Sequence, residues 1–286
     1  MRVTRIVYLN GAWIPEADAR ISIFDRGFLF ADAIYEVTAV IGGKLIEYAG
    51  HAARLQRSTE ELAMPCPLSP EALLAVHREI VRRNDLQEGL IYLQISRGVA
   101  DRDFAYPQDA APTLVLFTQA KAVVDNPKVK TGISVAMQPD LRWARRDIKT
   151  VQLLYPSMAK MEAARLGADD AWLVEDGFVT EATSASAHIV TKDGTLVTRQ
   201  LSQAILHGIT RASTLDLARR AGIPVDVRPF TPKEAMDAAE AFITSATSFV
   251  LPVTKIDGQP VGSGVPGPVS ARLRELYIAE KLASAI

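Results

Sequence analysis

The stretch WARRDIKTVQLLYPSMAKMEAA, residues 143–164, contains the lysine around which the rest of the chain is organised. Lys149 follows Ile148 and runs into Val151 and Leu153, so its amine is expected among apolar side chains. A lysine in apolar surroundings loses hydration, which lowers the pKa of the amine and makes it a nucleophile. The other nine of the ten lysines lie in turns, beside a linker or on polar faces of predicted helices. Judged by the local pattern alone, such a lysine more often extends its amine to solvent. Other parts of the sequence are therefore needed to distinguish a nucleophile from a solvated side chain.

The composition is that of an ordinary globular protein. A length of 286 residues suits two domains, and hydrophobic residues make up 48% and charged residues 23% of the chain. The formal net charge of −1 removes the electrostatic argument for nucleic acid or an anionic membrane as a partner. The single cysteine, Cys66, cannot form an internal disulfide. No apolar run approaches the ~20 residues that span a bilayer, and a cytoplasmic protein is expected.

Metal and nucleotide motifs are missing from the sequence. The histidines His51, His77, His188 and His207 have no metal-ligand spacing with Cys, Asp or another His, so no metal is predicted. The chain also has no GxGxxG after a strand and no GxxxxGK[ST], which argues against a dinucleotide or nucleoside triphosphate site.

Residues 1–120 are predicted to form an N-terminal α+β domain. Two β-rich runs flank Asn10-Gly11, a dipeptide typical of a hairpin turn, and residues 19–24 alternate apolar and polar side chains like a half-buried strand. Further strands are expected at 33–46 with a turn at Gly42-Gly43, at 90–97 and at 113–119, and helices at 51–62 and 70–84, the second with Ser69 as its N-cap. The loop of ~15 residues between the last two strands is longer than a typical connection, and such loops are usually functional.

Residues 121–130, with a break at Asn126-Pro127, are the predicted interdomain linker, and residues 131–286 are the predicted C-terminal α+β domain carrying Lys149. Strands are expected there at 132–138, 170–175, 178–180, 186–191, 195–198, 241–245 and 250–258, and helices at 151–166, 208–222 and 268–283. The pattern predicts two domains, each with a mostly antiparallel sheet and flanking helices.

Three places in the sequence could bind an anion. Residues 206–211 place Gly208 before a helix start, where free N–H groups can hold a phosphate. Residues 244–248 form a turn rich in hydroxyl groups, and Arg54 lies on a helix of the first half. Each alone is more often a cap or a solvated side chain. Together, on a chain of nearly zero net charge, they favour a phosphate site.

Glu181 follows the apolar pair Phe178-Val179 and precedes small hydroxyl residues. It could hydrogen-bond a protonated ring nitrogen, or be an exposed turn acid. A lysine nucleophile, a phosphate cradle and a spare carboxylate are the parts that a pyridoxal-phosphate site needs. In such a site the lysine forms a Schiff base, the phosphate anchors the ring, and the acid keeps the ring nitrogen protonated.

Several stretches, in order and at matching spacing, resemble the motifs of one enzyme family. They are residues 24–37, 51–55, 141–149, 179–181, 208–211 and 244–245. Through them the chain resembles, over essentially its whole length, the fold-type IV (class IV) pyridoxal-phosphate-dependent aminotransferases, and within that family the D-amino-acid aminotransferases. The resemblance implies the two-domain α+β fold of that family.

The resemblance also implies a role for each matching residue. Lys149 would bind pyridoxal 5′-phosphate covalently and move a proton at the substrate α-carbon, and Glu181 would pair with the ring nitrogen. Leu206 would pack on the ring face, and Arg142 would lie near the phenolic oxygen. The other cofactor-binding residues would be Arg54, Thr183, Ser184, Ile209, Thr210, Ser245 and Ala246.

The substrate carboxylate would be held by Tyr35 and Arg102, with Phe104 beside them. In the family the loop that bears the arginine comes from the other subunit, which implies a homodimer with shared active sites.

This sequence departs from the family pattern at four places. Residues 102–104 read Arg-Asp-Phe where Arg-x-His is usual, and a lost hydrogen bond to a charged group is worth roughly 1.5–3 kcal/mol. Ala246 stands where a phosphate-contacting threonine is common, which leaves only a backbone N–H. Ser186 replaces a usual asparagine, and Tyr155-Pro156 replaces small residues.

The expected reaction is transfer of the amino group of a D-amino acid such as D-alanine to 2-oxoglutarate, giving pyruvate and D-glutamate. Alternatives of the same fold are a branched-chain L-amino-acid aminotransferase, an (R)-amine aminotransferase and aminodeoxychorismate lyase. A cofactor-free binding protein that kept the fold is the alternative of a different class, and it would be colourless.

Overall fold

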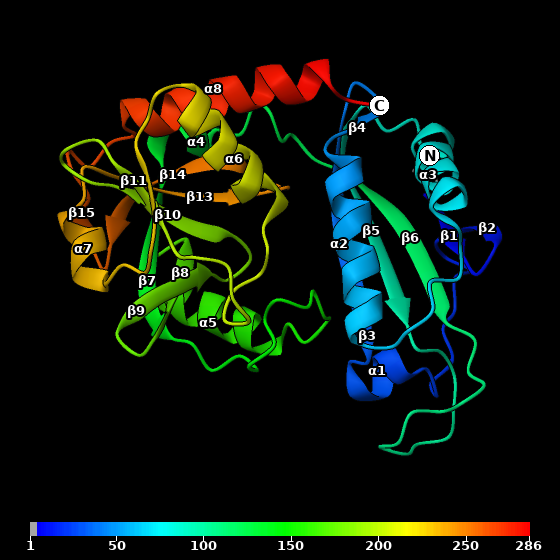
Figure 1. The fold of residues 1–286 in the computed structure, drawn as a ribbon. Coiled ribbons are helices and arrows are strands. Elements are labelled where there is room, and N and C mark those ends of the chain that lie inside the picture. Colours follow the sequence, from blue (N-terminus) through cyan, green and yellow to red (C-terminus); the bar gives the residue numbers. More distant parts are fainter. Residues whose placement is uncertain (1–4) are drawn as a thin grey trace. The chain divides into compact units, whose positions relative to one another are not determined.

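The structure is a computed structural model that describes residues 5–286 (Figure 1). The chain folds as two compact units. Unit 1 comprises the described part of Met1–Ala122, with Ile148–Gln152 and Ser284–Ile286, and unit 2 comprises Val123–Asp147 and Leu153–Ala283. The sequence placed Lys149 in the second domain, but its segment groups with unit 1.

Unit 1 is built on an antiparallel sheet, with six strands among the described residues in the order β2-β1-β6-β5-β3-β4. Its strands are β1 (Ile6–Leu9), β2 (Ala12–Pro15), β3 (Ala33–Ile41), β4 (Lys44–Leu45), β5 (Glu88–Ser96) and β6 (Thr113–Ala120). Helix α2 (Tyr48–Glu61) packs on β3, and α3 (Pro70–Arg83) packs on β1 and β6 (Figure 1). The predicted hairpin at Asn10-Gly11 and the predicted N-cap are confirmed, because the Ser69 hydroxyl accepts the Ala72 N–H at 3.2 Å.

The strand predicted at residues 19–24 is wrong. The segment forms no strand, and Ile21 and Ile23 are 46% and 68% exposed. The short helix α1 (Arg26–Phe30), which the sequence did not predict, follows it. The Asp25 side chain caps α1 by accepting the Gly27 N–H at 2.8 Å. The apolar side chains of the alternating pattern are therefore exposed in the isolated chain.

Unit 2 is built on a mixed sheet, and the prediction of a mostly antiparallel sheet is confirmed, because five of the eight strand pairs among the described residues are antiparallel. Nine strands of the described chain run in the order β12-β11-β10-β13-β14-β7-β8-β9, with β15 on β14. The strands are β7 (Ile133–Pro139), β8 (Asp170–Glu175), β9 (Phe178–Ala182), β10 (Ser186–Val190), β11 (Leu196–Thr198), β12 (Val225–Val227), β13 (Glu240–Ser245), β14 (Phe249–Ile256) and β15 (Gln259–Pro260). The pairs β14–β7, β7–β8 and β11–β12 are parallel.

A helical crossover explains the parallel pairing of β7 and β8. Helix α5 (Leu154–Arg165) lies between these strands in the sequence and packs on both, and such a return places the second strand parallel to the first. Helices α6 (Ile209–Arg220) and α8 (Pro268–Ala283) pack on β13 (Figure 1). Two short helices complete the unit: α4 (Lys128–Thr131) and α7 (Pro232–Asp237).

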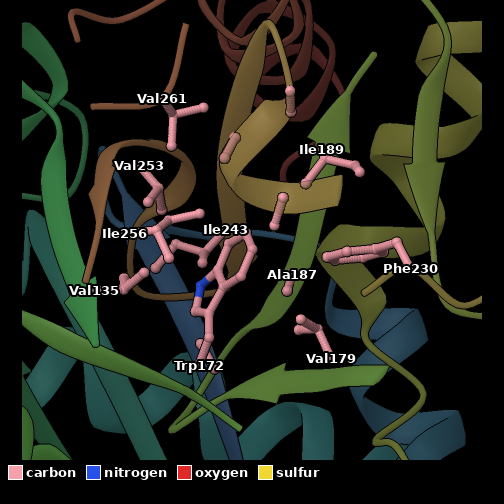
Figure 2. Close-up of a cluster of buried hydrophobic side chains, with 14 of the residues drawn as sticks. Val135, Trp172, Val179, Ala187, Ile189, Phe230, Ile243, Val253, Ile256 and Val261 are labelled. Carbon is pink, nitrogen blue, oxygen red and sulfur yellow. The ribbon is translucent and has the colours of Figure 1, made fainter. Parts of the chain in front are cut away.

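The core of unit 2 fixes the strand that carries Glu181. Trp172 of β8 and Phe230 are fully buried and meet edge to face, with ring centroids 6.0 Å apart (Figure 2). Ile243 of β13 and Val179 of β9 belong to the same cluster. Because Val179 lies two residues before Glu181 on one strand, burial of its side chain holds the carboxylate in place.

The helix predicted from Val151 begins only at Leu154. The segment before it is extended along β3, where the Val151 N–H donates to the Ala33 carbonyl at 3.0 Å and Thr150 forms a bridge with Ile34. Pairing with a strand far away in sequence therefore outcompetes the local helical pattern.

None of the helices in residues 5–286 is both long and apolar enough to cross a membrane. The same residues contain no group of three or more His, Cys, Asp or Glu side chains arranged to hold a metal ion. The cytoplasmic location stays a prediction from the sequence.

Candidate active site

Lys149 lies on the extended segment of unit 1 beside β3. Its carbonyl accepts the Tyr35 N–H at 3.0 Å, and its Nζ lies 4.2 Å from the centroid of the Tyr35 ring. Ile148 and Thr150 on either side are buried, whereas Lys149 is half-buried. Within the described part of unit 1, Nζ has no hydrogen-bonding or ionic partner. The amine is thus positioned by its backbone and left available for chemistry.

An aromatic ladder fixes the Tyr35 ring. Tyr35 stacks on Tyr92 with centroids 5.5 Å apart, and Tyr92 stacks on Phe117 at 4.8 Å, both at 22° between ring planes. The three residues lie on neighbouring strands β3, β5 and β6. Stacking across strands restrains each ring, so the tyrosine beside the lysine has a defined orientation.

Arg54, a predicted phosphate ligand, is bound to a buried carboxylate of unit 1. Its Nε and Nη2 donate to the two oxygens of Glu36 at 2.7 and 2.8 Å, and His51 Nδ1 meets Glu36 Oε2 at 2.8 Å. Burial by itself raises the pKa of the Glu36 carboxyl, but the charges and hydrogen bonds of Arg54 and His51 hold it well below its usual range. The phosphate role of Arg54 stays a prediction.

Arg102 and Phe104 come together on the long loop of unit 1. The Arg102 guanidinium lies 5.4 Å from the Phe30 ring centroid and 5.5 Å from that of Phe104. The two rings meet edge to face at 5.6 Å, and Phe104 is 79% exposed. Arg26 holds the loop by donating to the Asp103 carbonyl at 2.6 Å. The loop thus presents a cation flanked by aromatic rings.

Glu181 of unit 2 is a buried carboxylate with two partners. Oε2 accepts a hydrogen bond from Arg142 Nη1 at 2.8 Å, and Oε1 accepts the Leu206 N–H at 3.0 Å. Burial raises the pKa of Glu181, while Arg142 and the Leu206 N–H act in the lowering direction. The structure therefore brings together three of the predicted cofactor-binding residues.

Asp140 completes this network, although the sequence did not single it out. Its two carboxylate oxygens accept from Arg142 Nε and Nη2 at 2.9 and 2.7 Å. The Thr180 hydroxyl donates to Asp140 Oδ2 at 2.6 Å. The spacing Asp-x-Arg, which precedes Lys149 by a few residues, was a signal for this pair in the sequence.

The two anion-binding elements of unit 2 lie at one end of its sheet. Gly208 precedes α6 without a side-chain cap, so the N–H groups of Ile209 and Thr210 in the first turn are not used within the helix. A Cβ on Gly208 would approach the Ser186 hydroxyl to 2.7 Å. Ser186 pairs in turn with Thr244, which leads into the hydroxyl turn at Ser245.

The hydroxyl turn is linked internally. Ser245 Oγ lies 3.1 Å from Thr247 Oγ1 and 2.8 Å from Ser248 Oγ, and Ala246 offers only its backbone there. Thr210 is buried and its hydroxyl lies 3.5 Å from that of Tyr277. These groups are the kind of neutral donors that bind a phosphate.

Thr183 and Ser184 differ in their surroundings. The Thr183 hydroxyl donates to the Asp170 carboxylate at 2.5 Å, whereas Ser184 is exposed. Thr183 is therefore engaged in holding the chain after β9, and cofactor contacts of either residue stay predictions.

The donor set of unit 2 fits pyridoxal 5′-phosphate. The segment that runs from Leu206 to α6 joins the Glu181 carboxylate at one end to the free N–H groups of the helix at the other. A carboxylate suits the protonated ring nitrogen, and helix N–H groups with nearby hydroxyls suit the phosphate. The amine suited to the aldehyde, that of Lys149, belongs to unit 1.

Comparison with known proteins shows the family to which this chain belongs. The model of the family Amino-transferase class IV matches residues 33–256. The chain is 36% identical over 270 residues to the D-alanine aminotransferase of Bacillus licheniformis, which covers 94% of each chain. It is 36% identical over 277 residues to the D-alanine aminotransferase of Listeria monocytogenes, covering 96% of this chain and 95% of that one.

Among solved structures, the fold is similar to those of branched-chain amino acid aminotransferases. The T.th. enzyme complexed with N-(5′-phosphopyridoxyl)-L-glutamate superimposes with a TM-score of 0.87 at 27% identity, covering 96% of this chain and 93% of that chain. The Escherichia coli enzyme has a TM-score of 0.86 at 21% identity, covering 97% and 94%, a likeness of fold alone.

Proposed function

Because this chain belongs to the class IV aminotransferases, we propose that it transfers the amino group of a D-amino acid to a 2-oxo acid. D-alanine and 2-oxoglutarate are the proposed substrates, and pyruvate and D-glutamate the products. The observation that carries the proposal is the agreement with D-alanine aminotransferases along almost the whole chain. The enzyme is a pyridoxal-phosphate-dependent transaminase, and its substrates are amino and 2-oxo acids.

Each part of the chemistry falls to a residue of this chain. Pyridoxal 5′-phosphate, when bound, supplies the electron-withdrawing ring that stabilises negative charge on the substrate α-carbon. Lys149 Nζ would hold the cofactor and then take and return the α-carbon proton as general base and acid. Glu181 would accept a hydrogen bond from the ring nitrogen. The first turn of α6 and the turn at Ser245 would bind the phosphate, with Arg54 as a further ligand.

Arg102 and Tyr35 would bind the substrate α-carboxylate. A guanidinium gives strong, charge-assisted hydrogen bonds to a carboxylate. Substitution Arg102→Ala should raise the KM for D-alanine roughly tenfold to a hundredfold, since a hydrogen bond to a charged group contributes about 1.5–3 kcal/mol. An unchanged KM would place the carboxylate site elsewhere.

We infer that the active enzyme is a homodimer with shared sites. Large apolar side chains around α1 are exposed, including Ile21, Ile23 and Phe28, and such patches mark association surfaces. Ile21 and Phe28 also line a pocket of unit 1 together with Val115.

A mixing experiment tests the sharing. Lys149→Ala protein, which should be inactive, and Arg102→Ala protein, which should have little activity at D-alanine concentrations far below its raised KM, are unfolded together, refolded and assayed at such a concentration. If Arg102 serves the partner's site, hybrid dimers contain one intact site, and about a quarter of the wild-type activity should return at random pairing. If both residues serve the same subunit's site, no activity returns.

A branched-chain L-amino acid is the second candidate substrate class. The solved structures of similar fold favour it, and the bulky Phe104 replaces a hydrogen-bonding histidine of the family pattern. The replacement of that histidine by Phe104 also keeps an (R)-amine, a substrate without a carboxylate, as an alternative.

The visible spectrum of the purified protein tests the proposal. We expect a yellow protein that bleaches with D-alanine but keeps its colour with L-alanine, L-leucine or (R)-phenylethylamine. Bleaching by L-leucine instead would replace the proposed substrate with a branched-chain amino acid. Substitution Lys149→Ala should abolish turnover, and normal turnover in that variant would overturn the assignment of the lysine.

A further inference from the structure

The guanidinium of Arg142 is divided between two carboxylates. Nε and Nη2 donate to Asp140, and only Nη1 donates to Glu181. An arginine that meets a single carboxylate commonly binds both of its oxygens. Asp140 therefore occupies the edge of the guanidinium that could otherwise close on Glu181.

Asp140 is held firmly enough to play this part. Its side chain is completely buried, and its N–H donates to the Val174 carbonyl at 2.8 Å. The Thr180 hydroxyl and the Arg142 N–H donate to its carboxylate at 2.6 and 3.2 Å. Arg146 lies 3.5 Å away on another side. The position of Asp140 is thus determined by the backbone as well as by charge.

The division leaves Glu181 with unused acceptor capacity. A carboxylate offers about four lone-pair sites, and the structure fills one on each oxygen, from Leu206 and Arg142. Opposing effects also act on the charge of Glu181, and burial is the largest of them, so the pKa of its carboxyl is raised. Arg142 and, more remotely, Arg211 favour its ionised form, while burial and Asp140 oppose it. Glu181 can therefore accept one further charged donor.

We propose that Asp140 is a positioning residue, which keeps Arg142 from closing on Glu181 and so leaves that carboxylate open for the ring nitrogen of the cofactor. The inference rests on the proposed function only in that the enzyme binds pyridoxal 5′-phosphate; it is independent of which amino acid is the substrate. Asp140 itself would touch neither cofactor nor substrate.

The experiment compares two cofactors in the full-length protein. Wild type, Asp140→Asn and Glu181→Gln are stripped of cofactor, and the Kd is measured by fluorescence for pyridoxal 5′-phosphate and for its deaza analogue, in which CH replaces the ring nitrogen. The analogue keeps the aldehyde and the phosphate but cannot bond to Glu181. The ratio of the two Kd values therefore reports the Glu181 contact alone.

A neighbouring ion pair provides the matched control. Arg146 donates from Nη1 and Nη2 to Glu175 at 2.7 and 2.6 Å, a pair in the same loop region that does not include Glu181. Substitution Glu175→Gln weakens an arginine–carboxylate pair without freeing Arg142.

In Asp140→Asn we expect the Kd for pyridoxal 5′-phosphate to rise roughly tenfold or more, because the charge-assisted hydrogen bond between the ring nitrogen and Glu181 is weakened. The Kd for the analogue, which lacks this bond, should change less than about twofold. Glu181→Gln should show the same selective loss, and Glu175→Gln should match wild type. An equal loss for both cofactors in Asp140→Asn would mean a general structural role and overturn the inference. A wild-type protein that binds neither cofactor would overturn the proposed function as well.

If Asp140→Asn does not fold, Thr180→Val provides a second test of the inference. It removes one hydrogen bond from Asp140 without removing its charge, so the preference for pyridoxal 5′-phosphate over the analogue should fall by a few fold. Thr180→Ser keeps the hydroxyl and should behave as wild type. A preference unchanged in Thr180→Val, with Asp140→Asn unfolded, would count against the inference.

Discussion

Each unit of this chain contains a buried glutamate paired with an arginine, and the two pairs differ in how the guanidinium binds the carboxylate. In unit 1, Arg54 clasps both oxygens of Glu36, and His51 adds a third hydrogen bond. In unit 2, Arg142 reaches Glu181 through one nitrogen only. We call the first the closed pair and the second the open pair.

A third group decides which kind of pair forms. His51 adds a donor to Glu36 and helps to satisfy it. Asp140 instead adds an acceptor that draws the guanidinium of Arg142 away from Glu181. The pKa of Glu36 is held well below its usual range, whereas the pKa of Glu181 is raised. A closed pair is thus suited to holding a structure together, and an open pair to receiving a ligand.

The largest expected effect comes from breaking the closed pair. Substitution Glu36→Gln makes the buried Arg54 guanidinium face a neutral amide, and removing one partner of a buried ion pair destabilises a protein by roughly 3–5 kcal/mol. Urea unfolding of the wild type and the variant measures this loss. Glu79→Gln, which weakens the exposed pairs with Arg82 and Arg83, is the control and should leave stability unchanged. A loss below about 1 kcal/mol in Glu36→Gln would show that the closed pair is not structural.

A smaller effect should follow from His51→Leu, which removes the third hydrogen bond of the closed pair. Glu36 keeps both bonds to Arg54, so we expect a loss of about 1.5 kcal/mol in the free energy of unfolding. The preference for pyridoxal 5′-phosphate over its deaza analogue should not change, because His51 has no part in the open pair. A changed preference would show that the two pairs do not have separate roles.

The smallest effect concerns pH, and it should have opposite signs for the two glutamates. The folded-state pKa of Glu36 is lowered, so its stabilisation is present above the unfolded value near 4.5 and is lost as pH falls toward the folded value. The folded-state pKa of Glu181 is raised, so its contribution is present below the unfolded value and is lost as pH rises through the folded value.

Urea unfolding of the cofactor-free protein at pH 7 and pH 4 can detect this difference. The stability gap between wild type and Glu36→Gln should narrow at pH 4 by on the order of 1 kcal/mol. Over the same range the wild type should gain stability relative to Glu181→Gln. Gaps that move in the same direction would contradict the distinction between a closed and an open pair.

The sequence by itself determined those elements whose signals are local, and it indicated the family. Turn signals such as Asn10-Gly11, the cap at Ser69 and the closing helix at Pro268–Ala283 are local, and all three were predicted correctly. The motifs around Lys149, Glu181 and Gly208 were sufficient to indicate the family, because each residue type is required by the cofactor chemistry.

Only the tertiary structure decided which partners these residues meet. Strand pairing with β3 keeps Thr150 and Val151 out of the helix that their pattern predicts, and places Lys149 in unit 1. The contact of Asp140 with Arg142 is local, but its effect depends on Thr180 and Glu181, about 40 residues further along the chain. Whether a buried glutamate and its arginine form a closed or an open pair depends on how many donors and acceptors surround them. The folded chain sets these neighbours, because they come from distant parts of the sequence.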